Sequence, residues 1–173
     1  MNPSRHRAAA VTLAATGCLV VCGYALLALV QILWLNPLAA VPGAEIDQIW
    51  EDMAAANESM QTPMVVFVMA LGPLLAVGLL VAVLFTRIPP TVVAVVYLLL
   101  LALGPIAYFA ASFGPGMGLA DTYGIGGADY SPWARPLYAI SVLALAALVG
   151  IGIVSVVRRL RRSGSVRHSP SPA

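Results

Sequence analysis

Few side chains in this sequence could carry out chemistry, and they do not combine into a reaction centre. Cys18 and Cys22 lie one helical turn apart in an apolar run, without the further ligands that a metal ion needs. Asp121 and Asp129 could share a cation, but calcium loops need several closely spaced oxygen ligands, and no carboxylate lies between these two residues. We therefore expect no metal site, and we interpret the cysteines as small apolar packing residues.

Acid–base catalysis is poorly supported as well. Histidine, the side chain most often used for it, occurs only at His6 and His168, near the two ends of the sequence. The sequence lacks the Gly-Lys-Ser/Thr motif of phosphate-binding loops, the His-Glu-x-x-His motif of zinc proteases and the Gly-x-Ser-x-Gly motif of hydrolases. An enzyme would have to rely on carboxylates such as Glu51, Asp121 and Asp129. We predict no catalytic residue, no cofactor and no nucleic-acid partner, and we expect that the protein is not an enzyme.

The composition indicates what kind of protein contains these residues. Hydrophobic residues make up 61% of the sequence and charged residues 9%, and the mean hydropathy is +0.93. A soluble domain has roughly 25% charged residues to cover its surface. A chain this apolar needs lipid around it, so the sequence predicts an integral membrane protein.

Four apolar runs are each long enough to cross a hydrocarbon core of about 30 Å, which takes ~20 helical residues. The runs are continuous, and unpaired backbone groups are not tolerated in lipid, so we predict an all-α fold. The expected spans are residues 11–35, 64–85, 91–112 and 133–157. They form one membrane domain over 1–162, with loops at 36–62 and 113–132. The second loop is rich in glycine and expected to be solvated, and residues 163–173 are expected to form a disordered basic Ser/Pro tail.

The charges indicate the direction of the bundle. Every arginine except Arg135 falls at one end of the predicted spans, and every Asp and Glu falls at the other. The positive-inside rule makes the arginine end cytoplasmic, which predicts that both termini lie inside and that the protein resides in the cytoplasmic (plasma) membrane. The first run resembles a cleaved signal peptide, but it stays apolar up to Leu35, so we expect it to be retained as a span.

The first loop contains a short amphipathic pattern. Apolar residues recur at helical spacing between positions 46 and 53, and acidic residues fill the other face. This helix could cap the mouth of the bundle at the membrane surface, or it could dock a partner protein with Trp50 as its anchor. The acidic face favours contact with protein over anionic lipid. The candidate partner-binding residues are Ile46, Ile49, Trp50, Glu51, Asp52 and Met53.

A repeated tetrapeptide marks the second and third spans. Ala-Leu-Gly-Pro occurs at residues 70–73 and again at 102–105, at equal distances from the turn around Ile88. Because the two spans run in opposite directions, both motifs are expected at one depth. Each proline removes a backbone donor and frees a carbonyl. The motifs could be simple packing kinks, or they could line a small outward-facing vestibule. The candidate residues are Gly72, Pro73, Gly104 and Pro105.

The interior of the predicted spans holds no Asp, Glu, Lys or His, and Gln31 is the strongest polar group there. Coupled transporters usually need ionisable groups inside the membrane, so this class is disfavoured. Small residues would let helices approach closely; they are Gly17, Ala146, Gly150 and Gly152. An arginine cluster is expected to hold anionic lipid head groups; it comprises Arg158, Arg159, Arg161 and Arg162.

Two functional interpretations follow. The first is an accessory or assembly subunit, a membrane scaffold that presents acidic outer loops to a larger membrane protein. The alternative is a small oligomeric channel or facilitator, with an outer vestibule at the paired Gly-Pro motifs.

Overall fold

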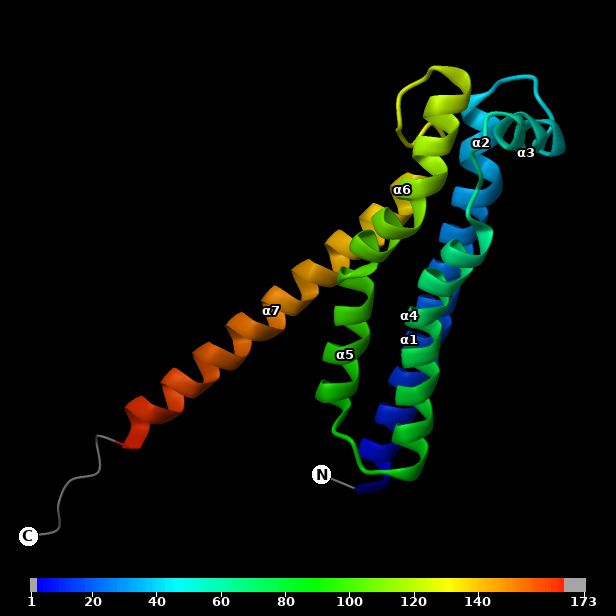
Figure 1. Ribbon diagram of the computed structural model, residues 1–173. Coiled ribbons are helices and arrows are strands. Elements are labelled where there is room, and N and C mark those ends of the chain that lie inside the picture. The colour runs from blue at the N-terminus through cyan, green and yellow to red at the C-terminus, as the bar shows by residue number, and fades with distance from the viewer. Residues whose placement is uncertain (1–2, 167–173) are drawn as a thin grey trace, which may run out of the picture.

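The computed structural model describes residues 3–166, with side chains described for residues 5–161. Within this part of the chain, every regular element is a helix (Figure 1). Four stretches are long and apolar enough to cross a membrane: Arg5–Ala40, Thr62–Phe85, Pro90–Tyr123 and Ala134–Arg161. The prediction of an all-helical fold with four helices that are long and apolar enough to span a membrane is therefore confirmed for the described residues.

The first span is longer than the sequence predicted. Helix α1 (Pro3–Val30), the π-helical turn η1 (Gln31–Leu35) and α2 (Asn36–Ala40) follow one another as a single rod (Figure 1). We expected a loop from Asn36, because Pro37 lacks a backbone donor and its ring would clash with an ordinary helical turn. The Asn36 N–H instead bonds to the carbonyl of Gln31, and this wider turn lets the rod continue past the proline.

The third span is bent at the second Gly-Pro motif. Helix α5 (Pro90–Ala102) ends beside Leu103, and α6 (Gly104–Tyr123) begins there with a different direction (Figure 1). The Leu103 N–H still bonds to the Leu99 carbonyl at 3.0 Å, so the backbone pairing continues through the bend. Pro105 has no N–H to offer, and the change of direction occurs at this position.

The predicted loop at 113–132 is mostly helical, because α6 runs on to Tyr123. Two of its glycines, Gly114 and Gly118, serve close packing and not a turn. A Cβ added at Gly114 would lie 2.6 Å from the Gln61 side chain, and one added at Gly118 would lie 2.8 Å from the Met53 methyl group. Gly124, with φ +65°, ends the helix in the left-handed conformation. The loop is therefore confined to residues 124–133.

Helix α4 (Thr62–Phe85) packs along α1, and α5 packs against both α1 and α7 (Ala134–Val166). The first part of α7 lies against the bundle, and the rest diverges from it (Figure 1). Leu143 and Ile153 are 70% and 58% exposed. We expected a disordered tail from Ser163. The helix extends to Val166 instead, and residues 167–173 lie outside the described part of the chain.

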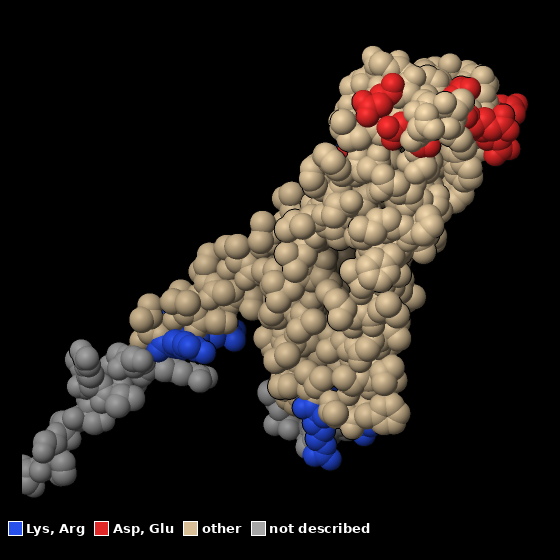
Figure 2. Space-filling view, viewed as in Figure 1, with Lys and Arg blue, Asp and Glu red and all other residues tan. Residues whose placement is uncertain are grey.

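The charges separate along the bundle axis. In the view of Figure 2 the acidic side chains gather at one end and the arginines that can be seen lie at the other, and we call these the acidic end and the arginine end. Arg135, near the start of α7, is the exception. The first span has 36 residues, which at 1.5 Å each is about 54 Å, well beyond a hydrocarbon core of about 30 Å. The excess length supports a structured region at the acidic end, where helix α3 (Ile46–Ala55) also lies (Figure 1).

Candidate functional site

The acidic end forms a compact unit, here called the acidic cap, made of residues 36–61 and 113–133. Asn36, which is 9% exposed, links the first helical span to the loop at residues 124–133 through hydrogen bonds. Its Nδ2 donates to the Ala128 carbonyl at 3.3 Å, and its Oδ1 accepts from the backbone N–H groups of Tyr130 and Ser131 at 2.7 and 3.3 Å. A single amide side chain therefore holds together segments that are far apart in the sequence.

Asp129 lies next to the Asn36 hydrogen bonds, and both of its carboxylate oxygens accept hydrogen bonds. Its Oδ1 accepts from the Tyr108 hydroxyl at 2.6 Å, and its Oδ2 accepts from the Tyr138 hydroxyl at 2.9 Å. The two rings meet edge to face, with centroids 5.9 Å apart. Both donors are neutral, so the charge of the carboxylate stays uncompensated by any cation among the described residues. Asp129 also lines a cavity of about 180 Å³ with aromatic walls, including Phe109 and Phe113.

The Gln31 side chain is fully buried one turn deeper in the first rod. It lies next to the Tyr108 hydroxyl, yet neither its Nε2 nor its Oε1 has a hydrogen-bond partner within the described residues. A buried polar group left in this state costs about 1–3 kcal/mol. The π-helical turn begins at this residue, and such turns often occur at functional positions.

The predicted partner-binding residues of α3 divide into two groups. Ile49 and Met53 are fully buried within this chain, so they are removed from the surface that a partner could touch. Trp50 is 36% exposed, and its ring lies 6.4 Å from the ring of Trp34. Asp52 accepts a hydrogen bond from Tyr123 at 2.8 Å, which ties α3 to the end of α6.

Ile46 is half-buried and Glu51 is exposed. The exposed residues of this helix therefore include Trp50 and Glu51 as well as Asp47 and Gln48. The exposed ring of Trp34, in η1, lies near that of Trp50. Sequence reasoning did not find Tyr108, Tyr123 or Tyr138 as partners of the acids, because each pair joins residues on different elements.

No known protein family, curated protein or solved structure matches this chain. Its function therefore has to be inferred from its own geometry.

The two Gly-Pro motifs share one cavity, of about 390 Å³, here called the Gly-Pro cavity. Gly72, Pro73 and Gly104 line it, between α1, α4, α5 and α6, while Pro105 is not among the lining residues. The walls are apolar except for Tyr24, whose hydroxyl lies 3.5 Å from the Ser141 Oγ. A Cβ at Gly104 would lie 2.6 Å from that phenol, so this glycine is needed for the close contact. The cavity suits an apolar group better than an ion.

The remaining predicted residues lie apart from these sites. Cys18 is buried and Cys22 half-buried, and no disulfide joins them. Within residues 5–161, no group of three or more His, Cys, Asp or Glu side chains could hold a metal ion. Arg158, Arg159 and Arg161 lie exposed on the last turns of α7, and the side chain of Arg162 lies outside the described part.

Proposed function

We propose that this protein is an accessory or assembly subunit of the plasma membrane that binds a larger membrane protein. One observation carries the proposal: the second half of α7 diverges from the bundle and leaves its apolar surface uncovered (Figure 1). A Cβ at Gly150 or Gly152 would meet no atom within 4 Å. Small residues at membrane helix surfaces let a second backbone approach closely, and Ala146 and Gly150 have the small-xxx-small spacing.

The acidic cap provides a second contact surface in this proposal. The Trp34–Trp50 pair is exposed beside Glu51, and the Asp129 carboxylate lacks a cationic partner among the described residues. Tryptophan is enriched among the residues that dominate binding energy at protein interfaces. A partner with a basic surface that also offers an apolar pocket would complement both features.

The orientation in this proposal follows the positive-inside rule. The arginine end would face the cytoplasm, with both termini inside, and the acidic cap would face the outside. The partner would then be bound in the membrane through α7 and outside the membrane through the cap.

Site-specific photo-crosslinking in cells tests the proposal. A crosslinker at Val149 is expected to join the chain to one partner in a fixed ratio, whereas a crosslinker at Leu74 serves as a lipid-facing control, because this residue of α4 is also exposed and does not line the Gly-Pro cavity. The change Gly150→Leu should abolish the crosslink at Val149 without altering the fold, since no atom of the chain lies close to this position. Equal crosslinking from both helices, or no effect of Gly150→Leu, would refute the proposal.

A channel or facilitator remains the second candidate, favoured by the single cavity that Gly72, Pro73 and Gly104 share. Its apolar walls suit passage of an apolar molecule. In liposomes, Pro73→Ala and Pro105→Ala should change the flux of such a molecule. No flux through the wild-type protein would end this interpretation.

A further inference from the structure

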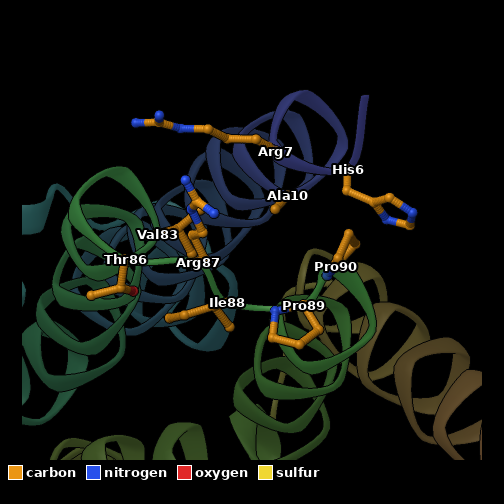
Figure 3. A pocket seen from close by; sticks show the side chains of 9 residues that line it. All are labelled: His6, Arg7, Ala10, Val83, Thr86, Arg87, Ile88, Pro89 and Pro90. Atoms are coloured by element: carbon orange, nitrogen blue, oxygen red, sulfur yellow. The ribbon is translucent and has the colours of Figure 1, made fainter. Parts of the chain in front are cut away.

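The arginine end contains a hollow of about 540 Å³, here called the basic pocket. It lies between the start of α1, the end of α4 and the turn that leads into α5 (Figure 3). Ala10, Val83 and Ile88 contribute apolar surface to its lining. His6, Arg7 and Arg87 contribute polar groups, and no acidic residue lines the pocket. The pocket therefore combines an apolar floor with a basic rim.

The basic side chains differ in how they are used. Arg7 donates a hydrogen bond to the Leu84 carbonyl at 3.3 Å, so it helps to cap the C-terminal end of α4. His6 and Arg87 have no hydrogen-bond or ion-pair partner among the described residues. Figure 3 shows His6 above Pro90 on one side of the hollow and Arg87 on the other. Two donor side chains thus border the same space with their hydrogen-bonding capacity unused.

The start of α5 adds to the positive potential. This helix begins at Pro90, and both Pro89 and Pro90 line the pocket. The positive ends of the α5 and α1 dipoles therefore lie beside the hollow, and the negative end of α4 opposes them. Two helix starts and one helix end meet there, which favours a negative group. All the acidic residues of the chain lie between Glu45 and Asp129, and those that are drawn in Figure 2 lie at the opposite end.

We propose that the basic pocket binds the phosphate group of an anionic phospholipid. The phosphate would lie between His6 and Arg87, and the adjoining glycerol and upper acyl carbons would contact Ala10, Val83 and Ile88. The pocket is at the end of the spans, where lipid head groups lie, and basic pockets between membrane helices bind such groups. The apolar floor favours a lipid over free phosphate, which has no apolar part. This site is separate from the arginine cluster at the end of α7 and independent of the proposed function.

Native mass spectrometry of the full chain tests the proposal. The chain is released from detergent containing either phosphatidylglycerol or phosphatidylcholine with identical acyl chains, so that only the head group differs. Arg158→Gln and Arg161→Gln are introduced in all samples to reduce binding at the end of α7. We expect the chain to retain phosphatidylglycerol at least about tenfold more tightly, because the choline cation is repelled by the basic rim.

Substitutions locate the binding. Arg87→Gln should weaken phosphatidylglycerol binding about tenfold, the effect of losing one charge-assisted hydrogen bond. The matched change Arg135→Gln, near the start of α7 and away from the basic pocket, should leave phosphatidylglycerol binding unchanged. The change Arg87→Lys keeps the positive charge and should retain most of the binding. If Arg87→Gln does not elute as a folded protein in gel filtration, His6→Gln gives the same comparison at an exposed residue.

Three outcomes would overturn the proposal. The first is equal retention of the two lipids. The second is equal binding by the Arg87→Gln and Arg135→Gln variants. The third is displacement of the lipid by millimolar inorganic phosphate, which would make the pocket a site for free phosphate and not for lipid.

Discussion

Gly17 lies directly under the ring of Tyr97, so close that a Cβ at position 17 would be 2.4 Å from the Tyr97 Cγ. The same tyrosine donates a hydrogen bond to the Ala76 carbonyl at 2.8 Å. This one side chain therefore joins α5 both to α1 and to α4. The contact depends on the absence of a side chain at position 17, because the ring occupies the space where a Cβ would be.

Gly17→Ala is expected to destabilise the fold by about 1–3 kcal/mol, the usual cost of overpacking. The measurement is unfolding in a detergent series, followed by circular dichroism. Gly23→Ala is the control in the same helix, because a Cβ there meets no atom within 4 Å. Similar stability of the two variants would mean that Tyr97 does not pack on α1 in this way.

Asn36→Ala should release the loop at 124–133 without unfolding the spans. The loop loses the acceptor for two backbone N–H groups, those of Tyr130 and Ser131. We expect hydrogen exchange at these two amides to become at least about tenfold faster. Gln48→Ala, at an exposed residue of α3, should leave the exchange unchanged. Faster exchange in α1 as well would show that Asn36 supports the whole bundle and not the loop alone.

Gln31→Met is expected to stabilise the protein by about 1–3 kcal/mol. Methionine has a similar shape and no polar group, so the change removes a buried amide that lacks a partner among the described residues. The midpoint of unfolding should rise, whereas Gln48→Met, at an exposed position, should leave it nearly constant. A fall in stability would indicate that the amide hydrogen-bonds to the Tyr108 hydroxyl that lies beside it.

The orientation can be tested with single cysteines in a Cys18→Ala, Cys22→Ala background. A membrane-impermeant maleimide should label Gln48→Cys in intact cells, since this residue lies in the acidic cap. Thr86→Cys, at the arginine end, should react only after the cells are made permeable. The reverse pattern would place the arginine end outside and contradict the positive-inside rule for this chain.

Sequence reasoning predicted the four spans well, because long continuous apolar runs leave helices as the only stable choice in lipid. It erred at the ends of the spans. Proline and glycine usually stop a helix in water, and residues 113–118 were therefore predicted as a loop. Within α6, Gly114 and Gly118 instead make room for Gln61 and Met53, a contact that depends on how distant segments meet.

The sites were harder to predict for the same reason. The apolar spacing around Trp50 indicated residues of α3 that could bind a partner, but it could not distinguish the buried Ile49 from the exposed Trp50. The pairing of Asp129 with Tyr108 and Tyr138 requires three elements to meet at one point. The basic pocket likewise joins the first helix to a turn about eighty residues later along the chain.

The divergence of α7 also gives the molecule an asymmetric outline (Figure 1). Helix α7 lies against the others near the acidic end and diverges from them toward the arginine end, while α1 and α4 stay packed together. If the four spans cross a bilayer, an isolated copy would have the form of a wedge, with a larger cross-section in the leaflet at the arginine end. In the proposed assembly, a partner helix beside α7 would fill the gap and turn the wedge into a column, which surrounding lipid could pack against with less distortion.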